Sequence, residues 1–221
     1  MHGGMAKADL STENIDALKR GLPNLLRHIH NIKEVYQLPC VVAVNAFPTD
    51  TEKEISEVIA QCQSLGVKAV LSNVWAEGGK GGMALAEEVV RLCEMPSTLH
   101  FAYDDEMSIP QKLEALVRRV YGGEGVLLTK EAQKQLAELE TLGVSHMPVC
   151  VAKTQYSFSD DPTKLGAPEG FIMTVRQLKV SAGAGFVVAL TGDILTMPGL
   201  PKVPAAEKID VDAEGKITGL F

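Results

Sequence analysis

Two apolar, β-forming runs separated by a helical pattern dominate the hydropathy of the chain. Residues 41–44 (VVAV) and 67–71 (VKAVL) are rich in β-branched side chains, while Ile55, Val58 and Cys62 between them recur at helical spacing. This order predicts a strand, a helix and a second strand, which together form a β-α-β unit with parallel strands. In open parallel sheets, ligands bind at the carboxyl ends of the strands.

Aromatic residues follow both predicted strands. Phe47 comes directly after the first strand, and Trp75, the single tryptophan, follows the second. Because parallel strands end at the same edge of a sheet, both rings are expected at that edge. One interpretation is that the two rings clamp a flat ligand ring; the other is that they cap the core, which is the commoner use of aromatic side chains.

Helix signals surround this unit. The first helix is expected to begin at Ser11 and to present an apolar face through Ile29, with a break or kink near Gly21 and Pro23. The helix of the β-α-β unit is expected to begin with a capping box of Thr49 and Glu52 and to end at Gly66.

The remaining pattern predicts an α/β fold with a mostly parallel sheet and flanking helices, followed by a smaller strand-rich region. Residues 1–158 and 159–221 are expected to form these two regions, packed on one another, with a soft boundary in the Asp-, Pro- and Gly-rich loop 159–169. Residues 197–201 are expected to form a stiff loop. Further helices are expected at 83–93, 109–121 and 129–142, strands at 99–103, 148–152, 171–180 and 186–190, and a terminal hairpin from 209–212 and 216–221.

Polar residues at the strand ends are candidates for ligand contacts. Asn45, Asp50 and Ser72 lie beside the aromatic positions, although Asn and Asp are also frequent turn and cap residues. The glycines of residues 78–82 (GGKGG) would let the backbone approach a ligand closely. This run is only a weak match to a phosphate-binding loop, because Lys80 is followed by glycine instead of serine or threonine.

Other clusters support weaker hypotheses. Residues 104–106 (DDE) either hold a cation or act as acid-base groups, or they form a solvated turn before a helix capped by Ser108. The four cysteines are widely spaced without a CxxC pair, and we expect all four to serve as small buried apolar residues. His28 and His30 lie on different helix faces, so no bound metal is expected from this chain alone.

Composition excludes several classes of protein. The net charge of −7 and the lack of a Lys/Arg cluster exclude a nucleic-acid partner. No apolar run reaches the roughly 18 residues that span a bilayer, and no signal pattern is present, so we expect no membrane association and a cytoplasmic location.

The sequence resembles formate-tetrahydrofolate ligase through motifs spread in family order along the whole chain. In that family a Phe and a Trp hold the folate pterin, which implies a tetrahydrofolate site at Phe47 and Trp75, lined by Pro48, Leu71, Gly78 and Gly79. The segment that begins at Lys153 lies near the nucleotide in the family, which makes Lys153 a candidate contact for phosphate or formyl phosphate; the alternative is an ordinary surface lysine. The motifs are NAFPTDT (45–51), WAEGGKGG (75–82), GAPEGF (166–171), SAGAGF (181–186), LTGDILTMPGLPKVPAA (190–206) and the terminal GLF.

The resemblance also implies what else the reaction needs. Family members use ATP with Mg²⁺, with a monovalent cation as a further candidate, and their amino-terminal portion carries a glycine-rich phosphate loop that this sequence lacks. We therefore expect a P-loop NTPase-like half without its P-loop, which is a fragment or one subunit of a split enzyme and inactive alone. Its expected partners are the missing P-loop half and further copies of itself. The alternative is a non-catalytic folate- or nucleotide-binding module or a truncated remnant.

Overall fold

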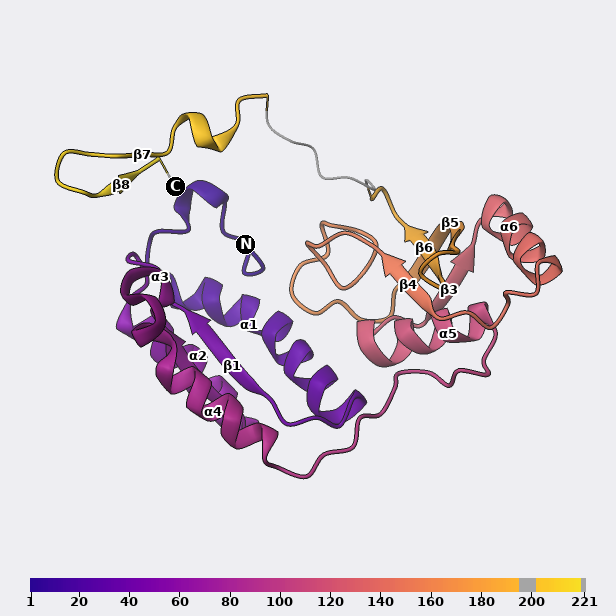
Figure 1. Ribbon diagram of the computed structural model, residues 1–221, viewed down its shortest axis with the longest axis horizontal. Helices are drawn as coiled ribbons and strands as arrows, with labels where there is room; N and C mark the ends of the chain where they lie inside the picture. Colours follow the sequence, from indigo (N-terminus) through magenta and orange to yellow (C-terminus); the bar gives the residue numbers. More distant parts are fainter. Residues whose placement is uncertain (195–201, 220–221) are drawn as a thin grey trace.

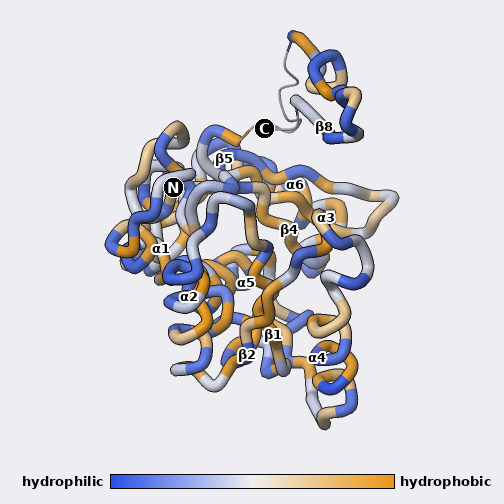
Figure 2. Tube along the Cα trace, turned by 90° about the vertical axis from the view of Figure 1, so that its left-hand side faces the viewer, coloured by the Kyte–Doolittle hydropathy of each residue, from blue (hydrophilic) through white to orange (hydrophobic). Residues whose placement is uncertain are grey.

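The computed structural model describes residues 1–194 and 202–219. Its first group of elements surrounds a two-stranded parallel sheet in which Val41 pairs with Lys68 and Asn45 pairs with Ser72. Figure 1 shows this group in indigo to magenta, and Figure 2 shows β1 and β2 between α2 and α4. The group comprises η1 (Lys7–Asp9), α1 (Ile15–His30), η2 (Asn31–Val35), β1 (Val41–Asn45), α2 (Glu52–Ser64), β2 (Lys68–Ser72), α3 (Val74–Glu77), η3 (Gly78–Gly82) and α4 (Met83–Cys93).

Apolar packing on one face of this sheet explains the first group. Ile29 of α1, Cys62 of α2 and Val67 before β2 are buried together against Val42 and neighbouring apolar side chains. Helices α1 and α2 therefore cover one face, as expected where parallel strands are buried by their connecting helices. The predicted β-α-β unit is confirmed, including the parallel pairing of its strands.

The second group is built on a four-stranded mixed sheet with the order β3-β5-β6-β4. Strand β3 is parallel to β5, β4 is parallel to β6, and β5 and β6 run antiparallel. Its core contains Ile109, Leu113, Val175 and Val187, each at most 1% exposed. The elements are α5 (Ile109–Leu116), η4 (Val117–Tyr121), β3 (Gly125–Leu128), α6 (Lys130–Thr141), β4 (Val149–Ala152), β5 (Ile172–Ser181) and β6 (Phe186–Thr191).

A small hairpin completes the described chain. Strands β7 (Asp210–Val211) and β8 (Ile217–Thr218) pair antiparallel after η5 (Ala205–Glu207), and every residue from 202 to 219 is exposed. The predicted terminal hairpin is confirmed, whereas the loop expected at 197–201 lies outside the described residues. The fold class is α/β, with parallel strand pairs, flanking helices and a strand-rich carboxyl-terminal region, as predicted.

Sheet pairing crosses the position at which the two regions were expected to meet. Strands β3 and β4 precede residue 158, β5 and β6 follow it, and all four share one sheet. The short strand β3 was not predicted, because its four residues follow a glycine turn directly and only Thr129 separates them from α6. The strand expected at 99–103 is wrong: these residues form no strand, and Phe101 is 69% exposed.

Two predicted helix starts are wrong by two or three residues. Asn14, not Ser11, caps α1, where its side chain accepts a hydrogen bond from the Ala17 amide at 2.8 Å. The capping box of α2 consists of Thr51 and Glu54 instead of Thr49 and Glu52. Glu54 also accepts a hydrogen bond from the Asn14 amide at 3.0 Å, so one carboxylate ties the two helix starts together.

Helix α1 continues without a break through Pro23. The expectation of four buried cysteines is wrong for Cys93 and Cys150, which are both exposed; Cys62 is buried and Cys40 is intermediate. Each exposed cysteine lies on an element of which one side faces solvent, a property that the local apolar pattern did not reveal.

Candidate functional site

The ends of β1 and β2 bring the two predicted aromatic residues to one edge of the first sheet. Phe47 is 47% exposed and Trp75 is 60% exposed, so neither ring is buried as a cap on the core. The Trp75 indole N–H donates a hydrogen bond to the Ala46 carbonyl oxygen at 2.9 Å. This bond fixes the indole against the residue that precedes Phe47 and leaves much of the ring surface open.

Exposed apolar side chains surround the two rings. Leu71 is 38% exposed and Val74 is 47% exposed, and Pro48 is also exposed. Large contiguous apolar patches are uncommon on the surface of monomeric proteins and often mark binding sites, whereas single exposed apolar residues are normal. We refer to Phe47, Pro48, Leu71 and Trp75 as the aromatic platform.

The polar candidates beside the platform have different surroundings. Asp50 accepts a hydrogen bond from the Phe47 amide at 2.8 Å, and the Asp50 amide donates to the Phe47 carbonyl oxygen at 3.0 Å. Asp50 therefore closes the turn that holds Phe47, which is the turn role considered for it from the sequence. Asn45 is exposed, whereas Ser72, its neighbour in the sheet register, is buried.

In the glycine loop that follows Trp75, Gly81 packs closely against Asn73, whereas Gly79 has no close neighbours. Gly78 has φ +59° and ψ −143°, a conformation essentially restricted to glycine. A Cβ atom at Gly81 would lie 2.5 Å from the backbone carbonyl group of Asn73. The backbone amide of Asn73 also donates a hydrogen bond to the Gly81 carbonyl oxygen at 3.1 Å. A Cβ atom at Gly79 would meet nothing within 4 Å. The loop thus packs against Asn73 while Gly79 faces open space.

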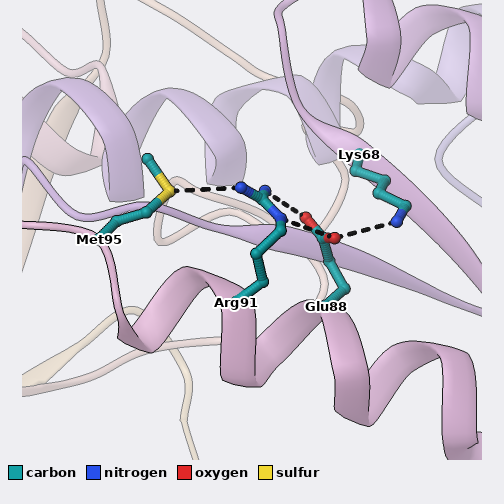
Figure 3. A network of polar contacts seen from close by, with 4 residues as sticks. All are labelled: Lys68, Glu88, Arg91 and Met95. Carbon is teal, nitrogen blue, oxygen red and sulfur yellow. Dashed lines mark hydrogen bonds and ion pairs between the residues drawn. The ribbon is translucent and has the colours of Figure 1, made fainter.

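An ion-pair network around the buried Glu88 anchors the helix that follows this loop (Figure 3). Glu88 of α4 is 3% exposed; its Oε2 accepts from Lys68 Nζ at 2.9 Å and its Oε1 accepts from Arg91 Nη2 at 2.6 Å. Hydrogen bonds from Arg91 and Lys68 lower the pKa of Glu88 to about 2, despite burial, which acts in the opposite direction. Because Lys68 belongs to β2, the network fixes α4, and hence the glycine loop, to the strand that carries Leu71.

This network was not identified from the sequence. The spacing of Glu88 and Arg91 by three residues on a helix was a visible signal for one of its two pairs. The second pair joins residues 20 positions apart, and only the packing of α4 against β2 brings them together.

Lys153 lies in the second group of elements, directly after β4, and not in the aromatic platform. Its side chain is partly buried, and its Nζ donates to the carbonyl oxygens of Thr154, at 2.8 Å, and Ser157. The ammonium also lies 5.6 Å from the centre of the Tyr121 ring. Burial lowers the pKa of Lys153 to about 8, opposed by the charge of Asp160. These surroundings differ from those of an ordinary surface lysine.

The acidic run 104–106 is a solvated turn. Asp104 accepts a hydrogen bond from the Glu106 amide at 3.2 Å, and Ser108 forms a capping box with Gln111 at the start of α5. Within residues 1–194 and 202–219, no three His, Cys, Asp or Glu side chains are grouped so that they could hold a metal ion. None of the helices in these ranges is long and apolar enough to span a bilayer.

The structure therefore brings nine of the candidate residues to one edge of the first sheet: Asn45, Phe47, Pro48, Asp50, Leu71, Ser72, Trp75, Gly78 and Gly79. Comparison with known protein families gives an independent result for the chain as a whole. The family model for formate--tetrahydrofolate ligase matches residues 1–221. The chain belongs to the formate-tetrahydrofolate ligase family.

Proposed function

We propose that this chain supplies the tetrahydrofolate-binding surface of a formate-tetrahydrofolate ligase, in which Phe47 and Trp75 hold the pterin between them. The family to which the chain belongs is a ligase family that uses ATP, formate and tetrahydrofolate. The observation that carries the proposal is the exposure of both rings at one sheet edge, with the indole fixed by the Ala46 carbonyl oxygen. Stacking on aromatic rings contributes about 1–3 kcal/mol per heterocycle.

The open side of the glycine loop suits such a ligand. Gly79 has open space where a side chain would project, so a flat ring system can approach the backbone there. Pro48 and Leu71 add apolar contact area on either side, while Asn45 supplies an exposed amide for the polar edge of the ring. In this arrangement Asp50 acts indirectly, by closing the turn that presents Phe47.

The contribution of the platform to catalysis is positioning. In the family reaction, formate and ATP give formyl phosphate, and a nitrogen of tetrahydrofolate then attacks its formyl carbon. A ring held between two aromatic faces presents that nitrogen in one orientation, and fixing two reactants in this way can lower a barrier by about 7–11 kcal/mol in the best cases. Lys153 is the proposed contact for a phosphate group, since its partly buried ammonium is held by two carbonyl oxygens.

Binding of the ATP triphosphate and its Mg²⁺ is assigned to groups outside these 221 residues. The run at 78–82 lacks the hydroxyl residue that a P-loop places after its lysine, and Gly81 is used in packing against Asn73. The 221-residue chain by itself is therefore expected to bind tetrahydrofolate without catalysing ligation, and to do so in the cytoplasm. A non-catalytic folate-binding module is the second candidate, and it shares the same aromatic platform.

Titration of tetrahydrofolate into the purified chain tests the proposal. Binding quenches the fluorescence of Trp75, the sole tryptophan, and calorimetry measures the same affinity without that signal. We expect saturable binding that Phe47→Ala weakens about 5- to 150-fold, in line with the loss of one stacking face. Phe101→Ala is the matched control, because Phe101 is a more exposed phenylalanine outside the platform. Equal affinities of the two variants, or no binding to a folded chain, would refute the proposal.

Turnover separates the two candidate functions. Addition of a polypeptide that carries a P-loop portion of this family should restore formation of 10-formyltetrahydrofolate if the chain is part of a ligase. If folate binds but no complementing portion restores turnover, the result favours the non-catalytic module.

A further inference from the structure

One segment of the chain carries three of the proposed folate contacts. Residues 73–82 connect the end of β2 to the start of α4, and they include Trp75, Gly78 and Gly79. Phe47 lies on a different connection, after β1. The position of Trp75 relative to Phe47 therefore depends on how firmly β2 and α4 hold the two ends of residues 73–82, which we call the Trp75 segment.

Two contacts tie the ends of the Trp75 segment together. At its base, the Asn73 amide donates a hydrogen bond to the Gly81 carbonyl oxygen at 3.1 Å. Farther from the segment, Lys68 Nζ on β2 donates to Glu88 Oε2 on α4 at 2.9 Å, as Figure 3 shows. Lys68 is the first residue of β2, so this second tie joins the strand to the helix at the end opposite the aromatic platform.

The carboxylate in the second tie is shielded from water, whereas its two cationic partners are exposed. Both oxygens of Glu88 accept hydrogen bonds, from Lys68 and from Arg91. A buried carboxylate holds such partners firmly, because their loss would leave its charge unpaired. Within residues 1–194 and 202–219, β2 pairs with β1 alone, so backbone hydrogen bonds hold only one edge of the strand. Side-chain contacts with α4 are consequently a larger part of what fixes β2 than they would be in a wide sheet.

We propose that Glu88, held by Lys68, is a positioning residue for tetrahydrofolate, because the tie keeps the Trp75 segment in the geometry in which it meets the ligand. The inference rests on the proposed folate site. It concerns residues that act at a distance, since Lys68 lies about 13 Å along the strand from Ser72 at the platform end. A surface that is ordered in the free protein loses less conformational freedom on binding. Cutting the tie should therefore weaken folate binding through Trp75 and Gly79.

Two substitutions within the network separate the tie from the pairing of a buried charge. Lys68→Met and Arg91→Met each leave Glu88 with a single cationic partner. Arg91 lies on the same helix as Glu88, so only Lys68→Met cuts β2 from α4. In calorimetric titrations, Lys68→Met should weaken tetrahydrofolate binding about 3- to 10-fold, and Arg91→Met about twofold or less. Lys68→Arg should restore most of the affinity. Equal losses in the two methionine variants would overturn the proposal.

A matched glutamate in the second group of elements separates positioning from general stability. Glu114 of α5 accepts hydrogen bonds from Arg118 Nε at 2.7 Å and from the Val126 amide of β3 at 3.2 Å, so it also ties a helix to a strand. Glu88→Gln and Glu114→Gln should both lower the free energy of unfolding in urea. Only Glu88→Gln should lower folate affinity in the folded protein. An equal loss of affinity in Glu114→Gln would assign the effect to stability and contradict the positioning role.

Hydrogen exchange gives a readout that needs no ligand. The Asn73 amide, which closes the base of the Trp75 segment, should exchange faster in Lys68→Met than in the wild type. The Thr129 amide, which donates to the Val175 carbonyl oxygen in the second group, should not change. Unchanged exchange at Asn73 would overturn the proposal. Equal folate affinity in the wild type and Lys68→Met would also overturn it and leave the folate site intact, whereas a folded wild type that binds no folate would refute the proposed function and this inference with it.

Discussion

The two sheets of this protein differ in how much of their apolar surface they bury. In the four-stranded sheet, Val175, Val187 and Ala189 are each 0% exposed, and α5 contributes Ile109 and Leu113 to the same core. In the two-stranded sheet, the carboxyl-terminal end leaves Leu71, Phe47 and Trp75 exposed, by 38%, 47% and 60% respectively. The first arrangement contributes chiefly to stability, and the second retains apolar surface that a ligand can cover.

This difference predicts that comparable substitutions act on different properties in the two sheets. A truncation in the four-stranded sheet should lower the free energy of unfolding and leave folate affinity unchanged. A truncation at the carboxyl-terminal end of the two-stranded sheet should lower folate affinity and leave the free energy of unfolding nearly unchanged. The expected effects below run from the largest to the smallest.

Leu113→Ala should produce the largest loss of stability. Leu113 is 1% exposed within the core of the second sheet, and removal of a buried leucine side chain costs about 2–5 kcal/mol. Urea unfolding measures the loss, and tetrahydrofolate titration at low urea should give the wild-type affinity. A cost below about 1 kcal/mol would show that this core is not packed as described.

Gly81→Ala and Gly79→Ala form a matched pair within one loop. A Cβ atom at Gly81 would lie 2.5 Å from the Asn73 carbonyl group, so Gly81→Ala should destabilise the protein by about 1–3 kcal/mol. A Cβ atom at Gly79 meets open space, so Gly79→Ala should leave urea unfolding nearly unchanged and weaken folate binding. If both variants lowered stability equally, Gly79 would not be an open part of the loop.

Glu88→Gln should alter the pH dependence of stability. Partners lower the folded-state pKa of Glu88 from 4.5 to about 2, so its carboxylate stabilises the folded protein above about pH 4.5. That contribution is lost as the pH falls from about 4.5 to about 2. Unfolding measured across this range should therefore show a smaller loss in Glu88→Gln than in the wild type. Identical acid sensitivity would show that the network in Figure 3 does not stabilise the fold.

Leu71→Ala should have only a small effect on stability. Leu71 is 38% exposed, so truncation should cost less than about 1 kcal/mol in urea unfolding. A several-fold loss of folate affinity should accompany this small cost if Leu71 belongs to the binding surface. Unchanged affinity would remove Leu71 from the platform while leaving the two rings in it.

Much of the first sheet could be predicted because its pattern is local. Two β-branched runs and an amphipathic helix specify the β-α-β unit, and parallel pairing then places Phe47 and Trp75 at one edge. The start of α2 could not be predicted, because Thr49 with Glu52 and Thr51 with Glu54 both match a capping box. The structure uses Thr51 with Glu54, and Glu54 also accepts a hydrogen bond from the amide of Asn14, a residue distant in sequence.

The properties that depend on packing were also hidden from the sequence. Lys112 is 0% exposed and donates to the His146 carbonyl oxygen at 2.7 Å, although a lysine on an amphipathic helix is usually placed in solvent. The orientation of the indole through the Ala46 carbonyl oxygen likewise depends on how two loops meet. Sequence patterns located the edge that carries the platform, whereas the fixed orientation of Trp75 required the structure.

The central claim is that Phe47 and Trp75 hold the same ring, and a double-mutant cycle tests it most directly. Calorimetry would measure tetrahydrofolate affinity for the wild type, Phe47→Ala, Trp75→Leu and the double variant, since fluorescence is lost with Trp75. We predict that the two losses are not additive and differ from their sum by about 0.5–3 kcal/mol, as expected for residues that act on one group. Strictly additive losses, or no loss in either single variant, would contradict a shared stacking site.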